Sequence, residues 1–158
     1  MEIGIYLSHP DAKMPTRAYE GDVGYDLYAD RDIEIPFGAF AEVSTGVHLQ
    51  LPPDMFTQIA ARSSYGKNGL IIHPGTIDSG YTGELTIWIY NIGARTVDVS
   101  EEWITRVKKE NNPGPYYVYK GEKIAQMIFH KAERPELKQV KNLKQTERGD
   151  KGHGSSGK

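Results

Sequence analysis

One carboxylate lies in a glycine-rich stretch of the sequence, GTIDSGYTGEL, which runs from Gly75 to Leu85. Asp78 is followed three residues later by the aromatic Tyr81, and the surrounding glycines permit turns and close approach of a ligand to the backbone. A carboxylate held at a rigid bend can act as a general base that activates water. The alternative is an ordinary Asp-Ser-Gly turn, whose side chain only caps its own backbone.

A second polar group combines a guanidinium with two hydroxyls, in the tripeptide Arg62-Ser63-Ser64, and glycines follow at positions 66 and 69. A planar donor fork, neutral hydroxyl donors and free backbone N–H groups are the groups that bind phosphate. The spacing is not that of a Walker A loop. Taken alone, the tripeptide is explained equally well as a polar loop without a ligand.

Three further segments carry polar side chains that need an explanation. Asp26 lies within GYDLYA, where it is either a site residue or a strand-edge carboxylate. Gln126 interrupts the apolar run KGEKIAQMIF, and an amide in such a run needs a hydrogen-bond partner on another strand or on a ligand. The last eleven residues, RGDKGHGSSGK, contain Arg148, Ser155 and Ser156. They form either a disordered tail or a flexible clamp that orders around an anion.

The elements that must position these residues are short strands. Alternating apolar residues predict strands at 3–7, 25–29, within 33–51, at 56–61, 86–90, 116–119 and 120–129. Turn signals recur about every 8 to 12 residues and helical periodicity is almost absent, a pattern typical of an all-β sandwich or jelly roll. Within it, the stretch around Asp78 predicts a β-hairpin with this residue near the bend, and residues 62–69 predict a loop.

Residues 100–119, SEEWITRVKKENNPGPYYVY, break this rhythm with mixed charges and an Asn-Asn-Pro-Gly-Pro turn. We interpret them as an insertion, which is either a solvated excursion or a surface for a protein partner. The predicted organisation is one β domain over residues 1–147, with the insertion at about 100–119, and a flexible glycine-rich segment over residues 148–158.

Composition sets further limits. The chain has 158 residues, enough for one domain, and its 19 basic and 21 acidic side chains give a formal net charge of −2. This balance predicts neither a nucleic-acid surface nor a membrane anchor. The absence of cysteine excludes disulfides and agrees with a reducing cytoplasm. With no signal-peptide pattern and no apolar run of roughly 18 residues, we expect a soluble cytoplasmic protein.

Together these segments resemble the five motifs of the trimeric dUTP pyrophosphatases (dUTPases), and most closely the Gram-positive bacterial or phage type. The motifs GYDLYA, ARSSYG, GTIDSGYTGEL, GEKIAQMIF and RGDKGHGSSG occur in the family's order. The resemblance implies a jelly-roll-like β subunit and a homotrimer whose active sites draw residues from all three chains. It also implies hydrolysis of dUTP to dUMP and pyrophosphate, which limits uracil in DNA and supplies dUMP for thymidylate synthesis.

The resemblance also implies residue roles. Asp78 would be the general base for attack of water on the α-phosphorus, Tyr81 would exclude a 2′-hydroxyl, and Asp26 would support the site. Mg²⁺ would be held by the triphosphate and water rather than by side chains. The remaining substrate contacts, to uracil and to the phosphates, would come from Arg62, Ser63, Ser64, Gly75, Thr76, Ile77, Gln126, Arg148, Ser155 and Ser156.

Three departures from the family pattern affect these expectations. His153 stands where the fifth motif usually offers a Phe that stacks on uracil, so Trp88 or Tyr90 is a candidate to replace it. Ile72 stands where many members have an Asn that helps bind uracil. The insertion resembles those of phage members, some of which bind host repressor proteins, and it raises the prospect of a regulatory protein partner.

Two rival functions remain open from the sequence. The dCTP deaminases share the fold and place a catalytic Glu on the strand after the hairpin Asp, but Trp88 occupies that position here. The second rival is a dual-role or non-catalytic protein that binds a partner through the insertion or the C-terminal tail. Ammonia release from dCTP would distinguish the first, and Asp78→Asn, which should abolish pyrophosphate release while keeping dUTP binding, tests whether catalysis is retained.

Overall fold

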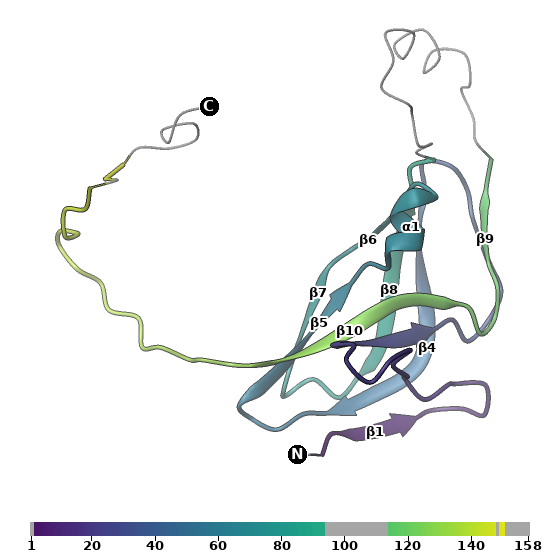
Figure 1. Cartoon of the computed structure of the whole chain (residues 1–158), viewed down its shortest axis with the longest axis horizontal. Coiled ribbons are helices and arrows are strands. Elements are labelled where there is room, and N and C mark those ends of the chain that lie inside the picture. The colour runs from purple at the N-terminus through teal and green to yellow at the C-terminus, as the bar shows by residue number, and fades with distance from the viewer. Residues whose placement is uncertain (1, 94–113, 148, 151–158) are drawn as a thin grey trace, which may run out of the picture.

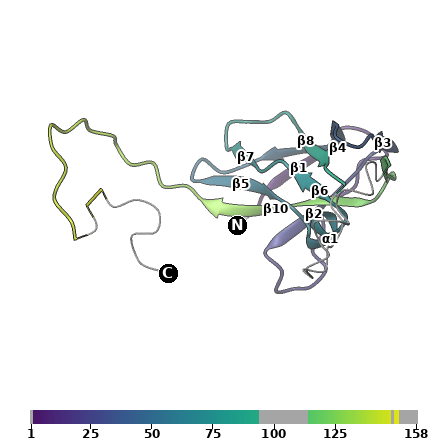
Figure 2. The ribbon, with the colours of Figure 1, turned by 90° about the horizontal axis from the view of Figure 1, so that it is seen from above.

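Two four-stranded antiparallel sheets pack against each other around one hydrophobic core (Figures 1 and 2). The computed structural model describes residues 2–93, 114–147, 149 and 150. Within them the elements are β1 Gly4–Leu7, β2 Gly24–Tyr28, β3 Ile33–Ile35, β4 Phe40–Gln50, β5 Met55–Ala60, α1 Ser63–Lys67, β6 Leu70–Ile72, β7 Gly75–Asp78, β8 Glu84–Asn91, β9 Tyr116–Val118 and β10 Lys123–Lys131.

The first sheet has the strand order β1-β4-β8-β6, and the second has the order β2-β10-β5-β7. A small ladder joins β3 to β9, so the strand expected at 116–119 forms and lies next to Ile33–Ile35. The prediction of an all-β fold of short antiparallel strands is therefore confirmed. None of the described residues forms a helix long and apolar enough to cross a membrane.

The core follows from the alternation of side chains along each strand. In β8, Leu85, Ile87 and Ile89 are buried, whereas Trp88 is 43% exposed and faces away from the core. In β10, Met127 is buried in the same way between the two sheets. Each sheet therefore has an inner apolar face and an outer face available for other groups.

The hairpin predicted around Asp78 is wrong. β7 pairs with β5, whereas β8 pairs with β4 and β6, so residues 79–83 cross from one sheet to the other. The alternation in the sequence shows which side chains face the core, but it does not identify the strand that each one pairs with. Two strands joined by a short glycine-rich turn therefore read as a hairpin even where the chain changes sheet.

The loop predicted at residues 62–69 contains a short helix, α1. Its central residue, Tyr65, is 2% exposed and packs in the core, where it fixes the segment to the body. A single helical turn is too short to produce a recognisable period in the sequence.

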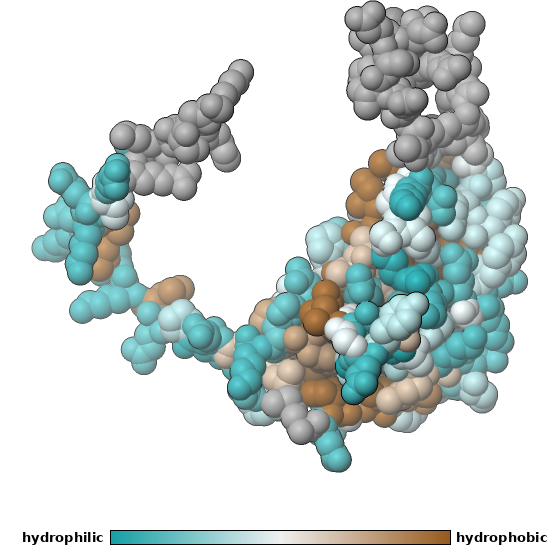
Figure 3. Space-filling model, in the orientation of Figure 1, coloured by the Kyte–Doolittle hydropathy of each residue, from teal (hydrophilic) through white to brown (hydrophobic). Residues whose placement is uncertain are grey.

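After β10, residues 132–147 leave the body as an extended arm (Figure 1). Its side chains are exposed almost throughout, and Leu137 is 97% exposed. Figure 3 shows a few hydrophobic residues along this mostly hydrophilic arm and a larger hydrophobic area on the body beside its origin. Arg148, His153, Ser155 and Ser156 lie outside the described residues, as do residues 94–113, which include residues 100–113 of the insertion.

Candidate active site

The outer face of the second sheet brings several of the predicted site residues together. Gln126 of β10 lies opposite both Asp26 of β2 and Ala60 of β5. Residues directly opposite each other on neighbouring strands point to the same side of a sheet. Further along β5, Phe56 lies opposite Asp78 of β7. Asp26, Gln126 and Asp78 therefore share this surface, which we call the site face.

The site face nevertheless has two separate ends. The Asp78 row crosses β5 at Phe56 and the Gln126 row crosses it at Ala60, four residues further on (60 − 56). At about 3.3 Å per residue the two rows are roughly 13 Å apart. Asp78 and Gln126 of one chain therefore cannot contact the same phosphate group.

An ion cluster holds the Asp26 end of the site face. Asp26 is buried, its Oδ1 lies 3.1 Å from Arg62 Nε, and its Oδ2 lies 2.7 Å from Lys123 Nζ. Arg62 Nη1 also donates to the Lys123 carbonyl oxygen at 2.9 Å. The hydrogen bond with Asp26 raises the pKa of Lys123, which therefore remains charged. Two cations around one anion leave a positive excess, which favours a phosphate ligand.

The helix next to this cluster presents Ser63 and Ser64 to solvent. Its buried Tyr65 donates a hydrogen bond from the phenol to Glu122 Oε1 at 2.8 Å, just before β10. Burial, followed by this contact with Glu122, raises the pKa of the Tyr65 phenol, which therefore remains a donor. The helix is thus fixed to β10, and the serines keep a constant place beside Arg62.

Gln126 rests on the backbone of Gly24. A Cβ added at Gly24 would overlap with the Gln126 amide, so the amide keeps this position only above a glycine. The amide Nε2 donates to the Ala61 carbonyl oxygen at 3.0 Å. The expectation that this amide needs a hydrogen-bond partner is confirmed, and the partner is the backbone that follows β5.

The Asp78 end is built differently. Asp78 is the last residue of β7 and is exposed, and its carbonyl oxygen accepts the N–H of Tyr81 at 3.0 Å. The Tyr81 ring folds over Gly83, where a Cβ would overlap with it, and its hydroxyl donates to the Glu84 carbonyl oxygen at 3.0 Å. This turn therefore carries both an exposed carboxylate and an aromatic ring that is 46% exposed.

The three residues before Asp78 form the rest of β7. Thr76 is exposed on the site face opposite Gln58, whereas Gly75 and Ile77 are half-buried opposite Ile59 and Thr57. The side chain of Ile77 packs against the core.

The two candidate stacking residues lie elsewhere. Trp88 and Tyr90 project from the outer face of the first sheet, on the opposite side of the sandwich from Asp78. Trp88 contacts His73, with the ring centroids 5.5 Å apart, and both candidate residues contact Phe40. Within one chain, neither Trp88 nor Tyr90 is therefore brought to Asp78.

Sequence reasoning missed Lys123, Glu122 and Tyr65. The two charged residues precede the apolar run of β10, where charges usually mark a solvated strand end, and their partners are distant in sequence. Tyr65 looked like part of a polar loop. The one available signal was a bulky aromatic side chain among small and polar residues.

The described residues include no group of three His, Cys, Asp or Glu side chains able to hold a metal ion. Both oxygens of Asp26 are already paired with cations. This donor set suits a divalent cation carried by a polyphosphate ligand better than one held by a cage of protein carboxylates.

Comparison with known proteins identifies the family. A family model described as dUTPase matches residues 10–107 and 109–157. A deoxyuridine 5'-triphosphate nucleotidohydrolase of Mycolicibacterium gilvum is 35% identical over 156 residues, which cover 94% of this chain and 90% of the relative. One from Mycobacterium tuberculosis H37Rv is 34% identical over 163 residues, covering 98% and 94%.

Solved structures agree. The dUTPase of Staphylococcus bacteriophage 80alpha with dUpNHpp superposes with a TM-score of 0.82 at 29% identity, over 99% of this chain and 98% of that chain. A dUTPase from phage phi11 of S. aureus, described with a species-specific insert, has a TM-score of 0.77 at 26% identity, over 92% and 100%. The sequence and fold together establish that the chain belongs to the dUTPase family.

Proposed function

We propose that the chain hydrolyses dUTP to dUMP and pyrophosphate, with Asp78 as the general base. The observation that carries this proposal is the exposed side chain of Asp78 at the end of β7, where the backbone is held by the hydrogen bond from the N–H of Tyr81. Asp78 would accept a proton from the water that attacks the α-phosphorus. Tyr81 would lie against the deoxyribose, where it leaves no room for a 2′-hydroxyl. The backbone of Gly75, Thr76 and Ile77 would read uracil.

The phosphates would bind at the other end of a site face. Negative charge builds on the departing pyrophosphate, and positioning plus charge neutralisation supply most of the catalysis at such a centre. Arg62 and its neighbour Lys123 provide positive charge, Ser63 and Ser64 provide hydroxyl donors, and Gln126 provides an amide. Asp26 would position Arg62 rather than take part in the reaction.

The two ends would meet in a homotrimer. Because Asp78 and Gln126 of one chain are separated by roughly 13 Å, a compact site needs Asp78 of one copy beside Arg62 and Gln126 of another. The hydrophobic area on the body beside the arm also supports burial against further copies (Figure 3). Each active site would then lie between chains.

Mg²⁺ would be bound through the triphosphate and water, and when bound it would neutralise phosphate charge and orient the chain of phosphates. A related dUTPase from phage phi11 is described as coordinating a structural Mg(II) ion. The residues that would lie near the phosphates are cations and neutral donors, which complement the nucleotide rather than the metal.

The C-terminal segment would complete the site. Arg148, Ser155 and Ser156 would close over the γ-phosphate, and His153, Trp88 or Tyr90 would cover the base. The substitutions Trp88→Ala and His153→Ala distinguish these candidate stacking residues, because base stacking contributes roughly 1 to 3 kcal/mol to binding. The variant with the greater loss of affinity for a non-hydrolysable dUTP analogue identifies the stacking residue.

A second role in binding a regulatory protein rests on the insertion at 100–119. Structural neighbours from phage 80alpha are described as controlling transfer of virulence genes. We propose the bacterial or phage-infected cytoplasm as the location, where dUTP is available. Deamination of dCTP is not favoured, because Trp88 occupies the position at which the dCTP deaminases have a catalytic Glu.

The decisive test measures pyrophosphate release from dUTP, dTTP, dCTP and UTP, each with and without Mg²⁺. We expect rapid release from dUTP alone, with a strong dependence on Mg²⁺. Ammonia release from dCTP, or equal cleavage of all four nucleotides, would contradict the proposal.

A further inference from the structure

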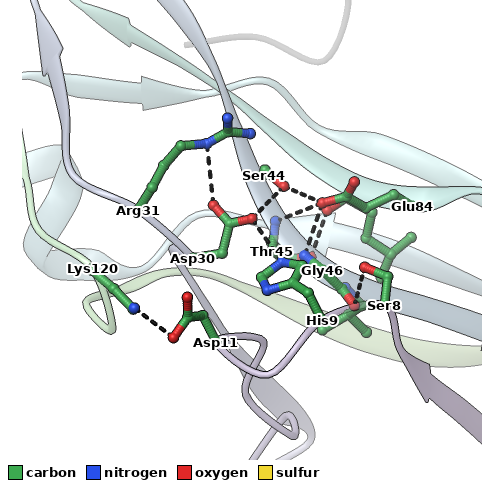
Figure 4. A network of polar contacts seen from close by, with 12 residues as sticks. Ser8, His9, Asp11, Asp30, Arg31, Ser44, Thr45, Gly46, Glu84 and Lys120 are labelled. Carbon is green, nitrogen blue, oxygen red and sulfur yellow. Dashed lines mark hydrogen bonds and ion pairs between the residues drawn. The ribbon is translucent and has the colours of Figure 1, made fainter.

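A polar network connects the N-terminal loop, β4 and the start of β8 (Figure 4). At its centre is the Glu84 carboxylate, the first side chain of β8. Glu84 Oε1 accepts the backbone N–H groups of Thr45 at 3.1 Å and Gly46 at 2.8 Å, and also the Ser44 hydroxyl. One carboxylate oxygen therefore gathers three donors from one short segment of β4.

The donors converge because β4 is irregular at this point. Its register against β8 shifts between Ser44 and His48, and Gly46 has a φ of 66°. A Cβ at Gly46 would also collide with Ala12 and His9, so the position requires glycine for two independent reasons. The bulge turns two backbone N–H groups toward Glu84 that a regular ladder would use elsewhere.

The far side of the network is a second carboxylate, Asp30. Its Oδ2 lies 2.6 Å from Ser44 Oγ and 3.0 Å from His9 Nε2, and its Oδ1 lies 3.2 Å from Arg31 Nε. Because a hydroxyl carries one hydrogen, Ser44 donates to either Asp30 or Glu84 at any moment. The hydrogen bonds from the backbone N–H groups of Thr45 and Gly46 do not depend on this alternation, and we call these two bonds the anchor of Glu84.

The electrostatics agree with this anchor. Burial raises the pKa of Glu84, but the hydrogen bonds from Ser44, Gly46 and Thr45 outweigh burial and leave the pKa below its ordinary value. The carboxylate is therefore ionised at neutral pH and forms charge-assisted hydrogen bonds with the bulge.

Glu84 also ends the segment that carries Tyr81. The Tyr81 hydroxyl donates to the Glu84 carbonyl oxygen, and the ring lies over Gly83. The neighbouring Thr82 carbonyl oxygen lies 3.0 Å from His48 Nδ1, just beyond the bulge. Anchoring of the Glu84 side chain therefore fixes the backbone on which the Tyr81 ring rests.

We infer that Glu84 is a positioning residue for Tyr81 and thereby sets the discrimination between deoxyribonucleotides and ribonucleotides. This inference rests on the proposed function, in which Tyr81 lies against the sugar. A ribonucleotide fits only if the ring moves away from the 2′ position, and the anchor at Glu84 resists that movement. Loosening the anchor admits UTP without removing any group that contacts the nucleotide.

The test compares three substitutions at one position through the ratio of kcat/KM for dUTP to kcat/KM for UTP. Glu84→Ala removes the carboxylate, and Glu84→Asp leaves a carboxylate on a side chain that is too short to reach the bulge. We expect the ratio to fall roughly tenfold in both, the factor that corresponds to one charge-assisted hydrogen bond. Glu84→Gln keeps an amide oxygen for the two backbone N–H groups and should retain most of the discrimination.

Glu42→Gln is the matched control. Glu42 lies on β4 and accepts a hydrogen bond from Thr86 Oγ1 of β8 at 2.7 Å, between the same two strands but away from the Tyr81 segment. Its ratio should equal that of the wild type. Thermal unfolding of every variant verifies folding, and if Glu84→Ala does not fold, the pair Glu84→Asp and Glu84→Gln decides.

The outcomes separate the two proposals. If the wild-type protein prefers dUTP and a folded Glu84→Asp variant keeps the same preference, the inferred role of Glu84 is overturned. The proposed function is unaffected by that result. A wild-type protein that releases no pyrophosphate from dUTP overturns the proposed function and, with it, the inference. A selective fall in the ratio with unchanged KM for dUTP supports positioning of the ring.

Discussion

Asp26 and Asp78 are carboxylates on the same face of one sheet, yet their surroundings differ completely. Asp26 is buried and each of its oxygens faces a cation, whereas Asp78 is exposed at the end of its strand. Both oxygens of Asp26 are held in ion pairs, so this carboxylate is a structural partner of the two cations. An exposed carboxylate on a fixed turn is free to accept a proton from water. This difference supports the proposal that Asp26 positions Arg62 and that Asp78 is the general base.

Replacement of Asp78 should have the largest effect. Asp78→Asn preserves the shape of the turn but removes the base, so pyrophosphate release from dUTP should fall by about 1,000-fold. Binding of a non-hydrolysable dUTP analogue, measured by calorimetry, should remain. Asp54→Asn, at an exposed turn before β5, serves as the control and should be fully active. Normal turnover by Asp78→Asn would remove the distinction between the two carboxylates.

The corresponding change at Asp26 should affect stability and phosphate binding together. Asp26→Asn leaves Arg62 and Lys123 facing a neutral amide, so the two cations repel each other and lose their shared partner. We expect Tm to fall by about 3 to 8 °C and KM for dUTP to rise, with kcat reduced far less than in Asp78→Asn. Calorimetry and steady-state kinetics measure both effects. A loss of kcat equal to that of Asp78→Asn would assign Asp26 to the chemistry.

The sequence predicted the surroundings of Asp26 and of Asp78 to different degrees. Alternation in the strands predicted the all-β fold and the inner face of β8, because burial imposes a period of two on any strand. The ion cluster was not predictable, since nothing local to Lys123 indicates that it meets Asp26. The path of the chain after Asp78 was predicted wrongly, because a crossing between sheets and a hairpin need the same glycines. Arg148 and the tail serines remain predictions.

A smaller effect is expected at Tyr65, which holds the helix beside the ion cluster but does not belong to the cluster. Tyr65→Phe deletes the hydroxyl that donates to Glu122 and should destabilise the protein by about 1 kcal/mol. Because α1 would then be held less firmly, KM for dUTP should rise a few-fold. Tyr116→Phe is the control, since its hydroxyl lies 3.4 Å from the same Glu122 oxygen and contributes less. A greater loss in Tyr116→Phe than in Tyr65→Phe would reverse this order.

The smallest effect concerns pH. The folded-state pKa of Glu84 is lowered from 4.5, so the unfolded chain binds this proton more readily than the folded protein. The resulting stability is complete above about pH 4.5 and is lost as the pH falls through the folded pKa. Glu84→Gln should flatten the dependence of Tm on pH in this acidic range. Parallel curves for the two proteins would show that Glu84 does not contribute to it.

The bare backbone at Gly24 has a consequence for how this surface tolerates change. Because Gln126 rests directly on Gly24, the main chain there acts as the floor beneath the amide. A single added methyl group would lift the amide away from the Ala61 carbonyl oxygen without deleting any polar atom. A substitution at Gly24 would therefore displace the Gln126 amide. Under the proposed function, it would lower the affinity for dUTP before it disturbed the packing of the core.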